Sequence, residues 1–119
     1  MTTTLLILFA HFVADFIFQT DEQAINKSKS NWWLTQHVFT YTIGLSFFMC
    51  GHLAFNHQTE ILYWLGINAG LHWVTDYFTS RLNSYLWRKE MRHWFFVGIG
   101  ADQFIHYACL LGTYEALIK

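Results

Sequence analysis

Residues 32–51 read WWLTQHVFTYTIGLSFFMCG, twenty residues without a single Asp, Glu, Lys or Arg. A helix of a water-soluble bundle needs a polar stripe along its outer side, and this segment has no charged residue to build one. Its length is close to the roughly 20 mostly apolar residues that a helix needs to cross a bilayer. We therefore expect a membrane-spanning helix here, and not a helix of the alternative fold, a soluble four-helix bundle.

Three further segments have the same apolar character, and each carries one aspartate in its interior: residues 3–20, 60–80 and 94–116. The apolar runs are too long for strands and do not alternate as strand residues would. The sequence therefore predicts an all-α fold, a four-helix transmembrane bundle. Its spans are expected at 3–20, 32–55, 60–80 and 94–116, within one integral membrane domain that covers residues 1–119.

The composition agrees with a membrane protein and excludes one class of partner. Hydrophobic residues make up 54% of the 119 residues and charged residues only 13%, against about 25% in typical soluble domains. The formal net charge of −1 lacks the basic excess of a nucleic-acid-binding protein, so the expected partner is the lipid bilayer. Nothing in the pattern requires or excludes an oligomer. Cys50 and Cys109 stand alone and form neither a metal motif nor a disulfide framework.

The basic residues predict how the chain is oriented. Six of the seven lie in the first and third connections between the spans, and only Lys119 lies elsewhere. Because basic loops stay on the cytoplasmic side, we expect a multi-pass protein of the inner (cytoplasmic) membrane with both termini outside the cytoplasm. The third connection, RLNSYLWRKEMRH at 81–93, is basic and amphipathic, so we expect it to lie along the membrane surface.

Ionisable residues interrupt the spans at a regular spacing. A charged side chain at the bilayer centre costs about 2.5–3.5 kcal/mol on insertion scales, so such residues are usually paired, inward-facing and functional. Residues four apart share one face of a helix, and three pairs have this spacing: His11 and Asp15, His72 and Asp76, Asp102 and His106. His37 adds an imidazole on the second span. We expect these side chains to converge in the cytoplasmic half of the bundle; the alternative is that the pairs only hydrogen-bond across it.

Three Asp and four His with no Lys or Arg inside the spans leave the carboxylates without a counter-charge. A divalent metal ion is the simplest remedy, and this mixture of ligands suits Zn, Mn or Fe, with one ion or two. The predicted ligands are His11, His37, His72, Asp76 and His106. Asp15 and Asp102 are the candidate catalytic bases, and the supporting residues are Gln19, Asn68 and Gln103.

Two classes of function follow from this reading. The first is a membrane-embedded, metal-dependent hydrolase that acts on a lipid or lipid-linked phosphoester at the cytoplasmic face, with Arg88 and Arg92 near the mouth of the site. The second is a non-enzymatic small membrane protein, either an ion or proton transporter or an envelope-modifying regulator, with a structural Asp/His cluster. The nearly uncharged outer halves of the spans, such as TTTLLILFA at 2–10, favour a closed site over a conduction path.

The motifs also resemble a known family. The combination of HFVADFIFQT at 11–20, a following Lys, His37, NAGLHWVTDY at 68–77 and DQFIH at 102–106 resembles an uncharacterised family of small bacterial and phage integral membrane proteins. More distantly it looks like the membrane-bound metal-dependent hydrolases, which share helices rich in His and Asp. One departure is that the family leads us to expect a basic residue shortly after Asp76, where this chain has Thr79.

Overall fold

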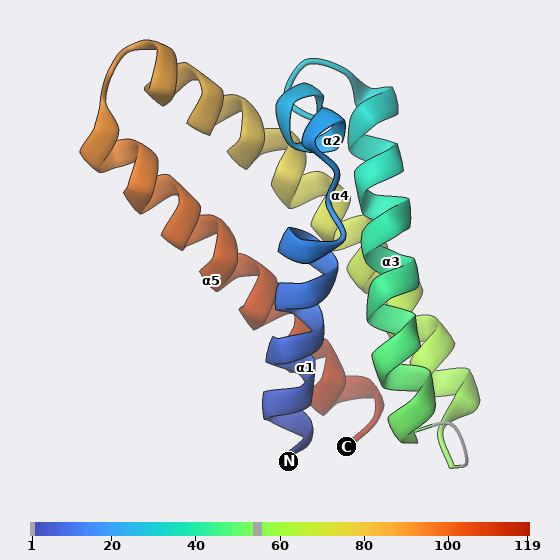
Figure 1. The fold of residues 1–119 in the computed structure, drawn as a ribbon. Coiled ribbons are helices and arrows are strands. Elements are labelled where there is room, and N and C mark those ends of the chain that lie inside the picture. The colour runs from blue at the N-terminus through green and yellow to red at the C-terminus, as the bar shows by residue number, and fades with distance from the viewer. Residues whose placement is uncertain (1, 54–55) are drawn as a thin grey trace.

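The computed structural model describes residues 2–53 and 56–119, and every regular element in this part of the chain is helical (Figure 1). No β-strand occurs among these residues, which confirms the predicted all-α class. In chain order the elements are α1 (Thr3–Phe12), the π-helical turn η1 (Val13–Ile17), α2 (Asp21–Asn26), α3 (Asn31–Leu53), α4 (Gln58–Arg88) and α5 (Arg92–Leu117).

The first predicted span is not one regular helix. α1 ends at Phe12 and continues as the π turn η1, which closes with a 3.0 Å bond from the Phe18 N–H to the Val13 carbonyl. A π turn holds an extra residue and often occurs at functional sites. Here it carries Asp15, and the close packing of this turn on α3 accounts for the difference: a β-carbon on Gly44 would lie 3.1 Å from that of Ala14.

The third predicted span is only the first part of a longer helix. α4 has 31 residues, which at ~1.5 Å per residue extend for roughly 46 Å. Residues 81–88, expected in a separate connection along the membrane surface, form its last two turns, because no Gly or Pro interrupts the helix there. The reversal into α5 takes place at Glu90, whose φ of 58° lies in the left-handed region. The predicted end of the second span, at 54–55, lies outside the described residues.

The helices pack so that both chain termini lie at one end of the molecule and α2 lies near the other (Figure 1). α4 packs against α3 and α5, and α1 against α3 and α5. Beyond this bundle, the ends of α4 and α5 that meet at the hairpin turn lean away from α3 (Figure 1). The result is a bundle at the end that carries the termini and a divergent α4–α5 hairpin at the end that carries α2.

The short helix α2 is held in place by local hydrogen bonds. It begins with a capping box, in which Thr20 Oγ1 accepts from the Gln23 N–H and Gln23 Oε1 accepts from the Thr20 N–H, both at 3.2 Å. Gln23 Nε2 also donates to Thr40 Oγ1 on α3 at 3.1 Å. Because Gln23 is buried, these contacts fix α2 against α3 and determine where the residues that follow it point.

An apolar core fills the bundle on the side of the termini. Its members come from α1, η1, α3, α4 and α5, and include Ile7, Tyr41, Met49, Trp64 and Leu110. The Trp64 indole N–H donates to the Leu110 carbonyl at 3.0 Å, which satisfies the only polar group of the largest buried side chain. This core anchors the four helices just below the polar cluster.

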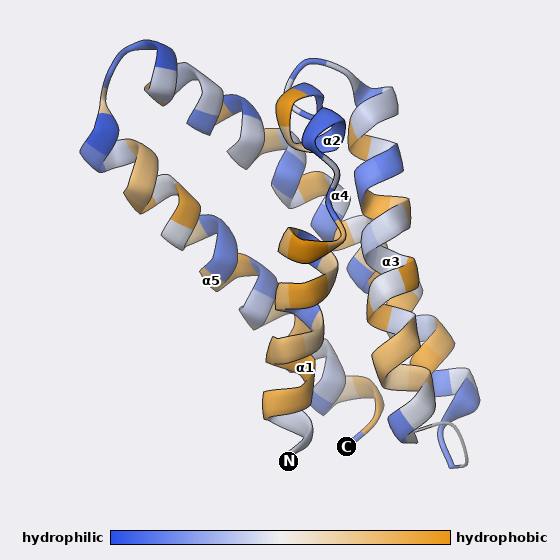
Figure 2. Cartoon of the chain, in the orientation of Figure 1, coloured by the Kyte–Doolittle hydropathy of each residue, from blue (hydrophilic) through white to orange (hydrophobic). Residues whose placement is uncertain are grey.

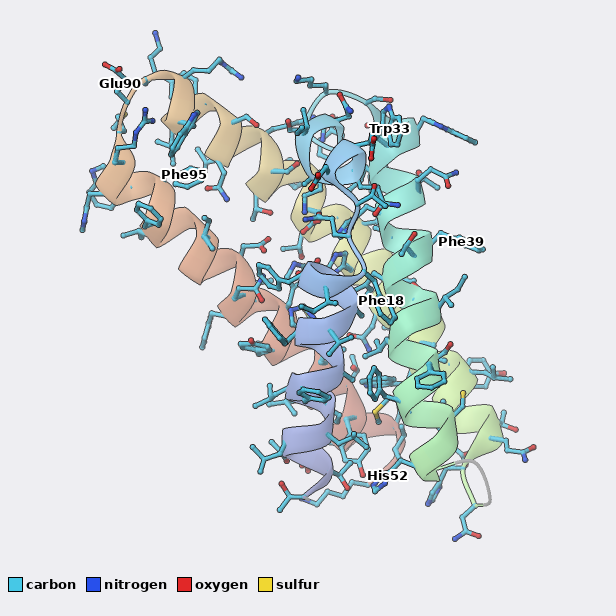
Figure 3. All side chains as sticks on the ribbon, in the orientation of Figure 1. Phe18, Trp33, Phe39, His52, Glu90 and Phe95 are labelled. Atoms are coloured by element: carbon cyan, nitrogen blue, oxygen red, sulfur yellow. The ribbon has the colours of Figure 1, made fainter. Side chains whose placement is uncertain are left out.

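The outer surface is unusually apolar, while polar groups lie inside. Phe39 points away from the bundle in Figure 3 and is 63% exposed, and Phe47 and Phe104 exceed 70%. Figure 2 shows hydrophobic residues along most of α1 and hydrophilic ones at the α4–α5 turn. By length and composition one helix in the described part of the chain, α5, can cross a membrane, and Thr3–Ile17 is a shorter apolar segment. These criteria do not confirm the predicted four-span arrangement.

Candidate metal centre

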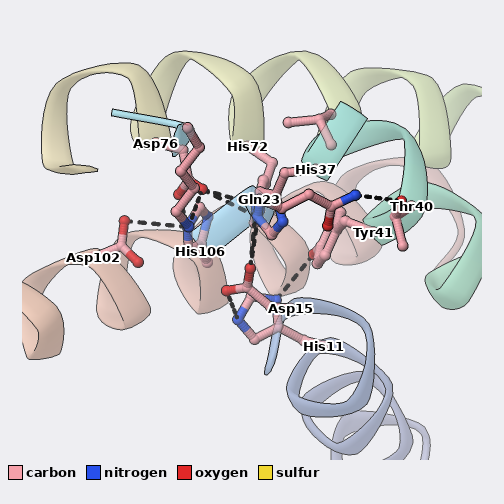
Figure 4. A network of polar contacts seen from close by, with 12 residues as sticks. His11, Asp15, Gln23, His37, Thr40, Tyr41, His72, Asp76, Asp102 and His106 are labelled. Atoms are coloured by element: carbon pink, nitrogen blue, oxygen red, sulfur yellow. Dashed lines mark hydrogen bonds and ion pairs between the residues drawn. The ribbon is translucent and has the colours of Figure 1, made fainter. Parts of the chain in front are cut away.

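Ionisable side chains from α1, η1, α3, α4 and α5 meet at one place inside the bundle (Figure 4). The structure brings together all seven Asp and His side chains that the sequence pattern singled out: His11, Asp15, His37, His72, Asp76, Asp102 and His106. All are buried except Asp102, whose side chain is 14% exposed. The i, i+4 spacing places the three pairs toward a common centre, as expected.

Four of these residues form what we term the inner group: Asp15, His37, His72 and Asp76. His37 Nε2 lies 3.0 Å from Asp15 Oδ1, 3.1 Å from His72 Nε2 and 3.2 Å from Asp76 Oδ2. His72 Nε2 lies 3.5 Å from each of the same two carboxylate oxygens. A tetrahedral ion with bonds of 2.0–2.1 Å separates its ligand atoms by about 3.3–3.5 Å. Five of the six separations among these four atoms are therefore close to those of a tetrahedral site, and all six lie within 4.8 Å.

The four residues of the inner group do not satisfy one another fully by hydrogen bonding. Each neutral imidazole carries one N–H, and two protonated Nε2 atoms at 3.1 Å would repel each other. Asp15 Oδ1 is buried and makes no hydrogen bond within the described residues, although His37 Nε2 lies 3.0 Å from it. Asp15 Oδ1 therefore has lone pairs free toward the two histidines, where a cation can bind.

A second set, the outer group, consists of Asp15, Asp102 and His106. His106 Nε2 lies 3.3 Å from Asp102 Oδ1 and 3.1 Å from Asp76 Oδ1. Asp76 therefore connects the two groups, with Oδ2 toward the inner group and Oδ1 toward His106. Thr79 donates to Asp102 Oδ1 at 2.6 Å, so the position where a basic residue was expected orients a carboxylate of the outer group.

His11 is close to both groups but belongs to neither. Its Nδ1 lies 3.0 Å from the Tyr41 hydroxyl and its Nε2 lies 2.9 Å from Gln103 Oε1. The Gln103 amide nitrogen donates to Asp15 Oδ2 at 3.3 Å and to Asp102 Oδ2 at 3.1 Å. His11 Nε2 must therefore be the donor to Gln103, and Nδ1 accepts from Tyr41. Both ring nitrogens are engaged, so His11 orients Gln103, and Gln103 orients two carboxylates.

The other two predicted supporting residues lie in different surroundings. Asn68 donates to the Trp64 carbonyl at 2.9 Å and to Thr113 Oγ1 at 2.8 Å, which links α4 to α5 at the edge of the apolar core. Gln19 lies beside the polar cluster, and its Oε1 is buried without a hydrogen bond among the described residues. Asn68 therefore serves the packing of the helices, while Gln19 faces the site.

A lysine that sequence reasoning missed reaches the centre. Lys27, which directly follows α2, donates from Nζ to Asp76 Oδ2 at 2.9 Å. Burial alone lowers the pKa of Lys27, but the charges of Asp76 and Asp15 outweigh it and raise the pKa above its ordinary value. The ammonium is therefore charged at neutral pH, and the expectation that no basic residue compensates the carboxylates is wrong.

The sequence did contain a signal for this lysine. The stretch TDEQ at 20–23 is a capping-box pattern, and it predicts a helical turn within the first connection. A residue four positions after Gln23 lies on the same face as Gln23, and that residue is Lys27. Because Gln23 faces α3, Lys27 follows it inward.

A cavity of about 870 Å³ opens beside the cluster between η1, α2, α4 and α5. Its polar floor includes Asp15, Asp76, Asp102 and Gln103. Basic residues line it as well, and aromatic and aliphatic side chains form much of its remaining wall: Lys27, Lys29, Arg88, Phe16, Trp87, Phe95, Phe96 and Ile99. In Figure 3 Phe95 points into the space between α4 and α5. Neither His37 nor His72 lines this cavity.

Of the two arginines expected near the mouth, one is available and one is engaged. Arg88 lines the cavity. Arg92 instead places its guanidinium 3.7 Å above the Trp87 ring and donates to the Trp87 carbonyl. It therefore stabilises the hairpin turn, and the basic side chains next to the cavity are those of Arg88, Lys27 and Lys29.

Fold and site together define an all-helical protein with a buried aspartate–histidine centre beside an amphiphilic cavity. The chain belongs to the family described as Protein of unknown function (DUF3307), whose model matches residues 3–119. Among curated proteins and solved structures, none matches the chain. The family match confirms the expected family of unknown function. The membrane character expected for this family and the distant likeness to membrane-bound metal-dependent hydrolases stay predictions.

Proposed function

We propose that this protein is a membrane-embedded, metal-dependent hydrolase that acts on a lipid or lipid-linked phosphoester at the cytoplasmic face. The observation that carries the proposal is the inner group, four buried ligand atoms within 4.8 Å of one another, next to a cavity of about 870 Å³. Asp15, His37, His72 and Asp76 would hold the ion. A divalent ion held there would supply a Lewis acid, and it would lower the pKa of a water that joins it as a fifth ligand.

The chain's own residues support the remaining parts of a hydrolytic site. Asp102 is the partly exposed carboxylate at the cavity, and Thr79 and Gln103 fix its two oxygens. With one ion in the inner group, Asp102 is placed to accept a proton from a molecule in the cavity. His11 keeps Gln103 in the orientation that serves both Asp102 and Asp15.

The shape and chemistry of the cavity support an amphiphilic substrate. Phe16, Phe95 and Phe96 offer an apolar wall of the kind that accepts hydrocarbon, while Lys29 and Arg88 offer positive charge. A phosphoester with a lipid tail combines the two features. The apolar exterior supports a location in the bilayer, because exposed phenylalanines and buried histidines and aspartates invert the usual distribution of a soluble domain.

The test is metal analysis of detergent-purified protein beside hydrolysis of phosphatidic acid in mixed micelles. We expect the parent protein to bind at least one divalent ion per chain. The His72→Ala and Asp76→Ala variants should lose both this ion and the hydrolytic activity. His93→Ala, at an exposed position outside the cavity, is the matched control and should keep both. A parent protein that binds no divalent ion would contradict the proposal.

A non-enzymatic role is the second candidate, and one observation favours it. The Lys27–Asp76 ion pair supplies part of the counter-charge that a metal would otherwise provide, so the cluster can hold four helices together as a hydrogen-bonded network. On this alternative the purified protein contains no stoichiometric metal, and chelators leave its thermal stability unchanged. The same metal analysis therefore separates the two candidates.

A further inference from the structure

The outer group raises the question of whether one ion is enough for this centre. It offers a carboxylate and an imidazole that the inner group does not use, Asp102 and His106. Asp76 Oδ1 is 3.1 Å from His106 Nε2, and His106 Nε2 is 3.3 Å from Asp102 Oδ1. These separations match those within the inner group. The two sets of ligands therefore stand side by side.

We propose that the centre is dinuclear, with a second divalent cation held by Asp102 and His106 and bridged to the first by Asp76 and Asp15. This inference rests on the proposed function. Each oxygen of Asp76 already faces a different group, Oδ2 the inner and Oδ1 the outer. Asp15 belongs to both groups. Carboxylates that face two groups in this way are suited to bridge two ions about 3.5–4 Å apart.

The histidine rings support the same spacing. The rings of His72 and His106 are stacked, with centroids 4.1 Å apart and planes inclined by 19°. His72 belongs to the inner group and His106 to the outer. Each Nε2 lies near its own oxygen of Asp76, 3.5 Å from Oδ2 for His72 and 3.1 Å from Oδ1 for His106. The stacking therefore fits two neighbouring ions.

The two sites differ in access, which assigns them different roles. The inner group supplies four buried protein ligands, and it reaches the cavity through Asp15 and Asp76 alone. Metal sites with four protein ligands are usually structural, whereas catalytic sites leave a position open. The outer group has only three members, and Asp102, the one partly exposed carboxylate of the centre, lines the cavity. The second cation is therefore the one that meets substrate, and Asp102 is its ligand and not a proton acceptor.

The charge of the centre indicates what would bind there. When the histidines bind metal and are therefore neutral, the three carboxylates and the Lys27 ammonium carry a net charge of −2. One divalent ion neutralises this charge, and two leave an excess of +2. A dianionic phosphoester at the open site removes that excess. We therefore expect inorganic phosphate, as the simplest such anion, to strengthen binding of the second ion.

The experiment loads the full chain in detergent with Mn²⁺, with and without inorganic phosphate, and measures bound metal and the electron paramagnetic resonance spectrum. With phosphate we expect two ions per chain and an exchange-coupled spectrum. This measurement uses the parent protein, so its result does not depend on whether a variant folds. Asp102→Asn and His106→Gln should each retain one ion with an uncoupled six-line spectrum. His93→Gln should keep two.

Other outcomes separate this inference from the function beneath it. One ion per chain in the parent, unchanged in Asp102→Asn, would overturn the dinuclear centre and leave the single-ion hydrolase with Asp102 as its base. Two ions without exchange coupling would also overturn it, because the ions would not share carboxylates. A parent protein without bound ions would overturn both proposals.

Discussion

At the scale of single residues, Lys27 decides how the centre behaves without metal. Its Nζ contacts Asp76 Oδ2, one of the four atoms of the inner group. A carboxylate oxygen has two lone pairs, so this oxygen can bind an ion and still accept from Lys27. The lysine then compensates charge in the empty protein and orients Asp76 in the loaded one.

Lys27→Met should therefore destabilise the metal-free protein more than the metal-loaded protein. Removing the Lys27 ammonium leaves the buried Asp76 carboxylate without its positive partner, which lowers the free energy of unfolding by about 1–3 kcal/mol. A divalent ion on Asp76 restores much of that compensation. Thermal unfolding in detergent, with chelator and with Mn²⁺, measures the difference. Lys29→Met, two residues further on and exposed, is the control. If Lys27→Met lost equal stability with chelator and with Mn²⁺, the ion and the lysine would not share Asp76.

His11 is predicted to behave as a positioning residue, in contrast to His72. Its two nitrogens are bonded to Tyr41 and Gln103, and partners that orient ligands typically contribute 10–100-fold to metal affinity. We expect His11→Gln to keep the metal stoichiometry and to weaken binding by about that factor. His72→Gln should lose an ion. Titration with Mn²⁺ measures both, and loss of a whole ion in His11→Gln would make His11 a ligand.

At the scale of the elements, the approach of η1 to α3 sets the position of Asp15. A β-carbon on Gly44 would lie 2.7 Å from Phe18 Cδ2 and 3.1 Å from the Ala14 β-carbon. Figure 3 shows Phe18 beside α3. Because Ala14 precedes Asp15, a substitution that pushes η1 away from α3 also moves the Asp15 carboxylate, which belongs to both the inner and the outer group.

Gly44→Ala should for this reason weaken both stability and metal binding. Overpacking of this kind costs about 1–3 kcal/mol, and the shift of η1 displaces Asp15 from the inner group. Gly70→Ala is the matched control on α4, where a β-carbon meets nothing within 4 Å, and it should be neutral or stabilising because alanine favours helices. Chemical denaturation and Mn²⁺ titration check the pair. Tighter metal binding in Gly44→Ala would contradict this account of η1.

The elements that the sequence predicted correctly are those that depend on local periodicity. His72 and Asp76 share a face of a regular helix, and both point to the centre. The π turn at η1 was not predictable in this way, because it accompanies the contact of Ala14 with Gly44, thirty residues further along the chain. Lys27 depends on the docking of α2 through Gln23 and Thr40. The spacing of residues within one segment does not predict contacts between segments that are distant in the sequence.

At the scale of the whole molecule, the polar and apolar regions are arranged along one axis. Both termini lie at the end with the apolar core, while α2, the cavity and the α4–α5 turn lie toward the other end (Figure 1). The basic residues of the first and third connections, among them Lys29 and Arg88, belong to this second end. If the bundle crosses a membrane, the centre therefore opens toward the side that the basic residues occupy.

This geometry gives a prediction for orientation. In a variant with Cys50→Ser and Cys109→Ser, a cysteine introduced at Lys89, exposed beside the hairpin turn, should react with a membrane-impermeant maleimide only after the cells are opened. A cysteine at Lys119, near the other end, should react in intact spheroplasts. The expected difference in labelling follows from the retention of basic loops in the cytoplasm. Reversed labelling would place the cavity on the outer side.

The apolar exterior gives a separate prediction, that washing the membranes with alkaline carbonate does not release the protein. Release by carbonate would show that the exposed phenylalanines do not contact a bilayer, although they surround a cluster of buried aspartates and histidines.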